Sequence, residues 1–260
     1  MDINYNHQQN IHTADGATTA LPLIFNDWKP NSLLDVGCGL GTWLKAALNF
    51  GISDVLGIDG IDIPVDRLLV SSKLFKQQNL TVPWSLGRRF DAVICLEVAE
   101  HLEDNFANNL VQTLTYHSDV IIFSAAPPWQ SGQQHVNCQL PSYWQALFNQ
   151  HGFVCSDAVR WRLWDIPLVE PWYKQNMFIA NRNLNIAGRE ERIRPIIHPD
   201  LLTFILSDIG WINPDIETKN RLELIQQIEN GSMPIAWYFS TLSKALLAKI
   251  GRRNFNKSAI

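Results

Sequence analysis

The feature that most constrains this chain is the stretch of residues 33–43, which reads Leu-Leu-Asp-Val-Gly-Cys-Gly-Leu-Gly-Thr-Trp. A short apolar run ends in an aspartate, and three glycines then alternate with other residues before what reads as a helix start. A side chain on any of these glycines would occupy space that a closely bound ligand must fill. The stretch therefore predicts a strand, a tight turn and a helix, with a ligand lying against the turn.

The glycine spacing argues against the dinucleotide-binding fingerprint G-x-G-x-x-G. After Gly37 and Gly39 that fingerprint requires Gly or Ala at position 42, where this chain has Thr42. A second buried-strand pattern, Val55 to Asp59, ends in a carboxylate about 20 residues after the glycines. Because an acidic residue at this strand end meets ribose hydroxyls in open α/β sheets, Asp59 is predicted to hold the sugar of a nucleoside.

Asp35 followed by G-x-G-x-G resembles the first motif of class I S-adenosylmethionine (SAM) methyltransferases. The resemblance covers roughly residues 20–180. It implies SAM as cofactor and the following cofactor-binding residues: Asp35, Gly37, Cys38, Gly39, Gly41, Asp59, Asn79, Leu96 and Glu97. Asn79 departs from the family, which usually has Asp there to accept a hydrogen bond from the adenine amine. The carbonyl oxygen of Asn can also accept this bond, but it lacks the charge.

Short apolar strands alternate with amphipathic helices along most of the chain, which favours right-handed β-α-β units and a largely parallel sheet. The resemblance implies a Rossmann-like α/β fold, with a mostly parallel seven-stranded sheet flanked by helices. We expect a flexible N-terminus over residues 1–17, a methyltransferase domain over 18–182 and a helical C-terminal extension over 183–260. The first helix is predicted from Thr18 to Trp28, and the last strand from Asn176 to Ala180.

Composition restricts the partners. The 260-residue chain has a formal net charge of −4, which gives no support to a nucleic-acid footprint. Its four cysteines include no C-x-x-C pair, so reduced thiols in a cytoplasmic protein are expected. No signal segment or transmembrane-length run is found, which predicts no stable membrane insertion. An amphipathic helix over residues 234–250 is predicted to dock on its own domain or in a homodimer, with weak membrane-surface binding as the alternative.

The acceptor side is predicted from Glu97, Glu100 and His101, at positions i, i+3 and i+4 after the fourth strand. A helix there would place all three on one face at the ligand-binding edge of the sheet, and His135 follows the fifth strand at the same edge. Two carboxylates and two imidazoles could hold a divalent cation, and the mixed nitrogen and oxygen set suits Mn²⁺ or Fe²⁺ better than Mg²⁺. This element resembles the metal site of small-RNA 2′-O-methyltransferases and an element of ubiquinone-pathway O-methyltransferases. In those families the metal grips adjacent oxygens of a ribose diol or a catechol.

A metal-free interpretation stays open, because Glu-Val-Ala-Glu-His-Leu is also common among SAM methyltransferases that use no metal. There the first Glu and its neighbours cap a helix and shape the pocket. His135 or His101 would then be the general base that removes the hydroxyl proton as the methyl transfers. Under both interpretations His135 and His101 are the predicted catalytic residues.

Aromatic residues gather in the segment that covers the acceptor in the family: Trp129, Tyr143, Trp144, Trp161, Trp164, Trp172 and Tyr173. Flat rings suit apolar rings and the C–H faces of sugars, although Trp161 and Trp164 equally suit core packing. The segment resembles bacterial methyltransferases of glycan and secondary-metabolite synthesis. We therefore expect O-methylation of a sugar or another polyhydroxylated small molecule. The alternatives are an N- or C-methyltransferase of a secondary metabolite, and a non-catalytic SAM-binding scaffold that acts through its C-terminal helices.

Overall fold

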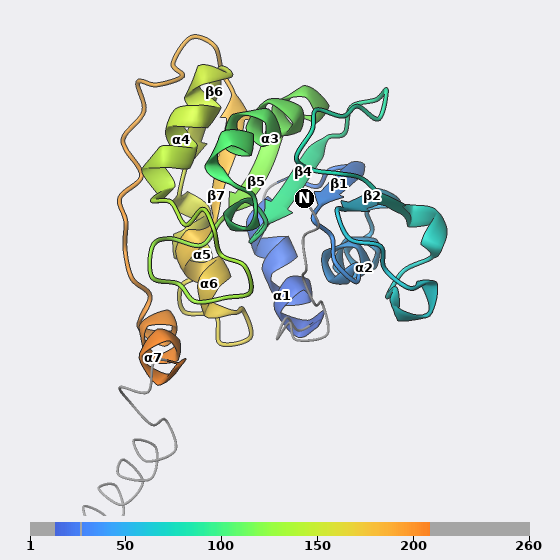
Figure 1. Ribbon diagram of the computed structural model, residues 1–260, viewed down its shortest axis with the longest axis horizontal. Coiled ribbons are helices and arrows are strands. Elements are labelled where there is room, and N and C mark those ends of the chain that lie inside the picture. The colour runs from blue at the N-terminus through green and yellow to red at the C-terminus, as the bar shows by residue number, and fades with distance from the viewer. Residues whose placement is uncertain (1–13, 27, 209–260) are drawn as a thin grey trace, which may run out of the picture. The chain divides into compact units, whose positions relative to one another are not determined.

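A computed structural model describes residues 14–26 and 28–208, which build an α/β fold around one seven-stranded sheet (Figure 1). The strands are β1 (Ser32–Val36), β2 (Asp54–Asp59), β3 (Phe75–Gln77), β4 (Ala92–Leu96), β5 (Val120–Ser124), β6 (Phe153–Ser156) and β7 (Phe178–Arg182). Their order across the sheet is β3-β2-β1-β4-β5-β7-β6. The first five strands are parallel, and β7 runs antiparallel to both β5 and β6. This arrangement confirms the predicted Rossmann-like, mostly parallel sheet.

Helices cover both faces of the sheet. They are α1 (Ala14–Phe25), α2 (Thr42–Phe50), α3 (Asp104–His117), α4 (Pro141–Gln150), α5 (Ala158–Leu163), α6 (Pro171–Asn176) and α7 (Pro199–Asp208), with 3-10 turns η2 (Val65–Arg67), η3 (Ser72–Leu74) and η4 (Ala99–His101). One apolar core lies under α1, α2, α5 and α6, and the other lies under α3 and α4 (Figure 1). Central strands are therefore buried on both sides, which is why β1 and β4 read as continuous apolar runs.

The N-terminal helix begins earlier than predicted. The predicted flexible segment extended to residue 17, but α1 starts at Ala14; residues 1–13 lie outside the described part of the chain. Gly16 and Ala17 are buried in this first turn, and a Cβ atom at position 16 would lie 2.0 Å from Oε2 of Glu170. The start was missed because close packing there depends on small residues, which carry no large apolar periodicity.

The last strand lies further along the chain than predicted. Asn176 ends α6, and β7 begins only at Phe178. The segment from Pro171 to Asn176 thus forms a short buried helix instead of the start of a strand. Proline at the first helical position favours this start, because a backbone N–H at that position would have no partner within the helix.

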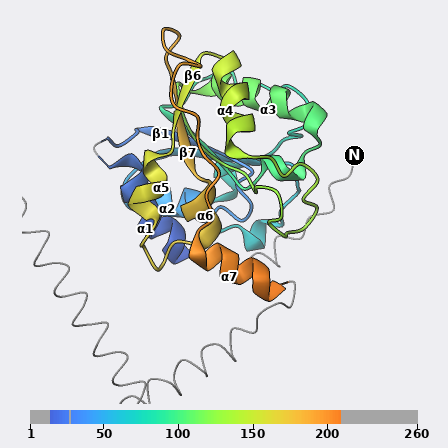
Figure 2. The same cartoon turned by 90° about the vertical axis from the view of Figure 1, so that its left-hand side faces the viewer.

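The compact unit that contains the sheet extends to Ile205, beyond the expected domain end at residue 182. Residues 183–198 contain turns and irregular backbone, and α7 follows. Figure 2 shows this segment descending past α6 to α7, which lies beside α6. The amphipathic helix expected over residues 234–250 lies outside the described residues. Of the helices in the described part, none combines the length and apolar character that a membrane crossing requires.

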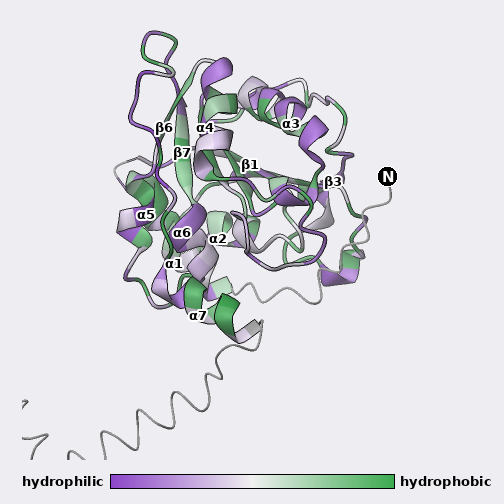
Figure 3. Cartoon of the chain, turned by 60° about the vertical axis from the view of Figure 1, so that its left-hand side comes forward, coloured by the Kyte–Doolittle hydropathy of each residue, from purple (hydrophilic) through white to green (hydrophobic). Residues whose placement is uncertain are grey.

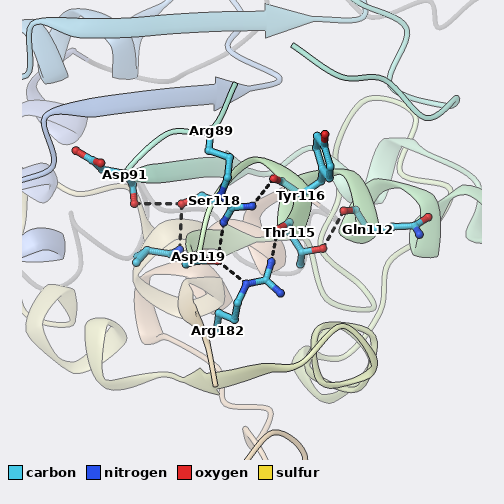
Figure 4. Close-up of polar contacts among 9 residues, drawn as sticks. Arg89, Asp91, Gln112, Thr115, Tyr116, Ser118, Asp119 and Arg182 are labelled. Carbon is cyan, nitrogen blue, oxygen red and sulfur yellow. Dashed lines mark hydrogen bonds and ion pairs between the residues drawn. The ribbon is translucent and has the colours of Figure 1, made fainter. Parts of the chain in front are cut away.

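Charged residues at the amino ends of the parallel strands are paired with one another (Figure 4). Asp119, just before β5, forms ion pairs with Arg89 and Arg182. The carboxylate of Asp91, just before β4, accepts a hydrogen bond of 2.7 Å from the Asn31 amide. The hydroxyl of Ser118 donates to the carbonyl of Asp91 at 3.1 Å. This edge of the sheet is therefore closed by contacts within the protein.

Candidate functional site

The alternating glycines form a left-handed turn between β1 and α2. Gly37 and Gly39 have φ angles of 77° and 50°, a region that side chains disfavour. A Cβ atom at position 37 would also lie 2.3 Å from Cγ2 of Val98, which follows β4. Gly37 is therefore required by its own backbone and by the packing of Val98, in addition to the predicted approach of a ligand.

Two aspartates stand at the ends of β1 and β2 beside this turn. The carboxylate of Asp59 accepts hydrogen bonds from the amides of Gly39 (2.8 Å) and Ile61 (2.9 Å), which joins the turn to the end of β2. Asp35 is 3% exposed, and its Oδ2 atom has no hydrogen-bond partner within the described residues. Burial raises the pKa of Asp35 well above its usual value, and the nearby charge of Asp59 raises it further.

A cavity opens between this turn and the ends of β2 and β4. Its walls include most of the predicted cofactor residues, namely Asp35, Gly37, Cys38, Gly39, Asp59, Leu96 and Glu97. They also include residues that the sequence analysis did not single out for the cofactor, among them Thr42, Trp43, Leu80 and Tyr173. Trp43 donates a hydrogen bond from Nε1 to the Tyr173 hydroxyl at 3.3 Å. No motif marks this pair, because 130 residues separate the two rings in the sequence.

Two predicted cofactor residues are not among the lining residues. Gly41 caps the start of α2 with φ 87°. The Oδ1 atom of Asn79 accepts hydrogen bonds from the Thr81 amide (2.9 Å) and hydroxyl (2.7 Å), and the neighbouring Leu80 lines the cavity. Cofactor binding stays a prediction for these two residues, as it does for those that line the cavity.

The chain turns sharply after β4, and this corrects the predicted helix. Glu97 has φ 55°, and its amide donates to the Ser124 carbonyl at 3.0 Å. Only the single turn η4 follows, so Glu97, Glu100 and His101 do not share one helix face. The left-handed residue reorients the backbone directly after the strand, and the Glu97 carboxylate accepts hydrogen bonds from Gln130 Nε2 (2.8 Å) and Asn176 Nδ2 (3.2 Å).

Glu100, His101 and His135 come together next to the cavity. Each offers one potential metal-ligand atom, and these atoms lie within 4.8 Å of one another. Glu97 is not part of this group, so the predicted set of four becomes a set of three. The two imidazole rings are 5.0 Å apart between centroids, and His101 also lines the cavity.

Burial and neighbouring charges shift the pKa values of residues in and beside this cluster. Glu100 is fully buried, and neither of its carboxylate oxygens has a well-formed hydrogen bond within the described residues. Burial raises the pKa of Glu100 well above its usual value, and the neighbouring Glu97 charge adds to this. Burial, together with His135, lowers the pKa of His101 to about 4. Burial also raises the pKa of Glu97, against the hydrogen bonds from its neighbours. His101 is therefore neutral near pH 7.

The loop after β5 is fixed over this cluster. Amides of Val136 and Asn137 both donate to the Glu100 carbonyl, at 2.9 and 3.0 Å. His135 Nδ1 lies 2.8 Å from the Gln130 carbonyl. Because a carbonyl only accepts, Nδ1 must carry the proton, which leaves the Nε2 lone pair available. Gly132 makes room for this ring, since a Cβ atom there would lie 2.1 Å from His135 Nε2.

The aromatic residues predicted to cover the acceptor have different environments in the structure. Trp144 is buried against Phe123 at a centroid distance of 5.2 Å, and Trp172 is also buried. Trp129 is 85% exposed. Of the seven predicted aromatic residues, Tyr173 alone is in the cavity wall. Spacing alone could not separate core rings from cavity rings, because Trp172 and Tyr173 are adjacent on α6 and only Tyr173 lines the cavity.

Comparison with known proteins agrees with this geometry. A family profile described as a methyltransferase domain matches residues 5–166. The ubiquinone biosynthesis O-methyltransferase of Cereibacter sphaeroides is 36% identical over 29% of this chain, and the chain spans about a third (32%) of that protein's length.

Solved structures share the fold. Magnesium protoporphyrin IX methyltransferase from Synechocystis PCC 6803, with bound SAM, has a TM-score of 0.50 and 20% identity over 70% of this chain and 86% of its own. A plantazolicin methyltransferase, in complex with a pentazolic analogue and S-adenosylhomocysteine (SAH), has a TM-score of 0.50 and 16% identity over 69% of this chain and 88% of its own. Because the profile matches more than half of its length, the chain belongs to the methyltransferase-domain family, and it shares the fold of these solved SAM-dependent enzymes.

Proposed function

We propose that this methyltransferase transfers the methyl group of SAM to a hydroxyl oxygen of a sugar or another polyhydroxylated small molecule. In this proposal, a divalent cation bound by Glu100, His101 and His135 holds the acceptor. The observation that carries the proposal is the environment of Glu100, whose buried carboxylate has no well-formed hydrogen bond and faces two histidines.

The donor set of the cluster fits a cation. Ionising a fully buried carboxyl group such as that of Glu100 is costly, and a bound cation would offset that cost. Ligand atoms about 2.1 Å from a metal ion lie no more than about 4.2 Å from one another, so atoms within 4.8 Å need only small side-chain adjustments. Imidazole nitrogen and carboxylate oxygen together favour Mn²⁺ or Fe²⁺ over Mg²⁺, which prefers all-oxygen ligands.

The chain's own residues prepare this site before any ligand binds. The Gln130 carbonyl fixes the His135 tautomer, so that Nε2 can serve as a ligand. His101 stays neutral near pH 7 and is likewise able to coordinate. A bound cation would lower the pKa of an acceptor hydroxyl and so reduce the need for a protein base. Holding the acceptor oxygen in line with the methyl group would supply much of the rate.

An oxygen acceptor is favoured by the sequence similarity to an O-methyltransferase, which includes 36% identity over the aligned region. In the metal-free alternative, His135 Nε2 removes the hydroxyl proton directly. An amine or carbon acceptor would need neither a metal nor a diol.

Metal binding is tested first by calorimetry with Mn²⁺ on the wild-type chain and on Glu100→Gln and His135→Ala. We expect binding to the wild-type chain and a loss of at least about tenfold in affinity in both variants. His151→Ala is the matched control, because His151 contacts Asn108 outside the cluster. Equal Mn²⁺ affinity in all four proteins would overturn the metal site.

Activity is tested by SAH production with vicinal diols (catechol and methyl glycosides), amines and carbon nucleophiles, with and without EDTA. We expect turnover on a diol that EDTA removes and Mn²⁺ restores. His135→Ala should bind SAM nearly as the wild-type chain does while losing turnover. Full activity in EDTA would favour the metal-free base, and SAM binding without turnover on any acceptor would favour a scaffold.

A further inference from the structure

Helix α6 is hydrophilic in sequence but buried in the fold. It appears mostly purple in Figure 3, yet Lys174, Gln175 and Asn176 are only 3%, 4% and 3% exposed. Buried polar groups of this kind are retained only where hydrogen bonds or ion pairs satisfy them. The partners of α6 lie on two sides, at the C-terminal segment and at the cavity.

A continuous series of hydrogen bonds crosses α6. The backbone N–H of His198 donates to Gln175 Oε1 at 2.8 Å, and Gln175 Nε2 donates to Asn176 Oδ1 at 3.1 Å. Asn176 Nδ2 then donates to Glu97 Oε1 at 3.2 Å and to Gln130 Oε1 at 2.9 Å. Gln130 Nε2 donates in turn to Glu97 Oε2 at 2.8 Å.

The direction of these bonds is fixed at both ends. A backbone N–H can only donate, so Gln175 must turn its oxygen toward His198 and its NH₂ toward Asn176. Asn176 must then turn its oxygen toward Gln175 and its NH₂ toward Glu97. The series ends at Glu97, whose two carboxyl oxygens accept from Asn176 and Gln130, and every amide orientation follows from the His198 N–H.

The donor at the start of the series is itself held firmly. The Nε2 atom of His198 lies 2.8 Å from the Trp164 carbonyl, and the Asp200 amide donates to its Nδ1 at 3.1 Å. Lys174 forms an ion pair of 3.0 Å with Asp200 at the start of α7. These contacts fasten the first turn of α7 to α6, beside which it lies in Figure 2.

We propose that Gln175 and Asn176 are positioning residues, which orient the Glu97 carboxylate in the wall of the cofactor cavity under the control of the His198 backbone N–H. Residues 198–200 are then part of the cofactor site although they lie beyond β7. If Asn176 turned over, its carbonyl oxygen would face the Glu97 carboxylate and repel it toward the cavity.

The test compares two buried glutamines in the full-length chain. Gln175→Met removes the acceptor for His198 N–H and the donor to Asn176 with little change of volume. Gln145→Met is the matched control, because Gln145 is 5% exposed, accepts from the Ile193 amide at 2.8 Å and donates to Glu190 at 3.1 Å. Gln145 lies on α4 and does not line the cavity.

We expect both variants to lose similar thermal stability, while only Gln175→Met binds SAH at least about tenfold more weakly by calorimetry. A purely structural role for Gln175 would lower stability without this difference in affinity. Gln175→Glu keeps the acceptor for His198 and loses only the donor when ionised, so it serves if the methionine variant does not fold. Equal SAH affinity in the folded position-175 variants and the Gln145→Met control would overturn the proposal. The readout involves neither metal nor acceptor, so it is independent of the proposed O-methylation.

Discussion

Acidic residues at the two edges of the sheet have opposite environments. At the amino ends of the strands, Asp119 is paired with Arg89 and Arg182, and Asp54 with Arg88 at 2.5 Å. At the carboxyl ends, Asp35 and Glu100 are buried and no basic side chain is ion-paired with either of them in the described part of the chain. The acidic groups of the first edge are neutralised by arginines, whereas those of the second are buried without an ion-paired basic side chain among the described residues.

This difference shows where each kind of charge acts. The amino-edge pairs are largely exposed, and such ion pairs each contribute about 1 kcal/mol or less to folding. The carboxyl-edge groups have raised pKa values because burial penalises their charge. Keeping such groups costs stability, and this favours their having a role in binding and catalysis. Removing charge should therefore have opposite consequences at the two edges.

The largest effect is expected for Glu100→Gln. This change keeps the shape of the side chain and removes the buried charge, so we expect turnover on the diol acceptor to fall at least about a hundredfold. The free energy of unfolding should stay equal or rise, because the neutral side chain no longer carries the cost of burial. Turnover assays and urea denaturation measure the two quantities. A stability loss together with full turnover would reverse the assignment of this edge.

The next effect is expected for Asp35→Asn in the cavity wall. We expect SAH affinity to fall about tenfold, because the carboxylate available to the ligand is replaced by an amide. Stability should rise by about 1 kcal/mol, since the cost of burying the Asp35 charge disappears, together with its repulsion by Asp59. Calorimetry and urea denaturation check both values. Unchanged SAH affinity would remove Asp35 from the predicted cofactor site.

A smaller effect is expected in how the stability difference between the wild-type chain and Asp35→Asn changes with pH, and its direction can be predicted. In the folded chain Asp35 has a raised pKa, so it holds its proton at a pH where the unfolded chain has released it. Wild-type stability therefore gains from this group as the pH falls through the raised pKa toward the unfolded value of about 3.9. The advantage of Asp35→Asn should accordingly shrink as the pH falls from the alkaline range toward the unfolded-state pKa. A constant or growing advantage would contradict this. Both proteins contain His101, whose lowered pKa changes stability in the opposite direction with pH. Subtracting one stability from the other removes this shared contribution.

The smallest effect is expected for Asp119→Ala at the amino edge. The change removes the ion pairs of Asp119 with Arg89 and Arg182. Because both arginine side chains are partly exposed to solvent, we expect the free energy of unfolding to fall by only about 1–2 kcal/mol. High salt should reduce this loss by screening. SAH affinity should be unchanged, because the cavity lies at the opposite edge. A tenfold drop in SAH affinity would end the distinction between the edges.

Much of the cavity wall could be predicted, because its residues follow strands directly in the sequence. Asp35 and Asp59 each stand at the end of an apolar strand, and parallel strands bring such ends to one edge. The acceptor side was predicted only in part. His101 and His135 do meet, but Glu97 is outside their group of potential ligand atoms. Its left-handed backbone conformation carries no marker in a non-glycine residue.

The sequence by itself determined the fold class and the glycine turn, since both depend on local patterns of apolar residues and glycine. Only the tertiary structure decided that Gln130, Asn176 and Tyr173 join the site, and that the C-terminal segment reaches it through Gln175. Those contacts join residues up to 130 positions apart. Buried amide networks depend on which donor meets which acceptor in three dimensions, and no sequence period encodes that match.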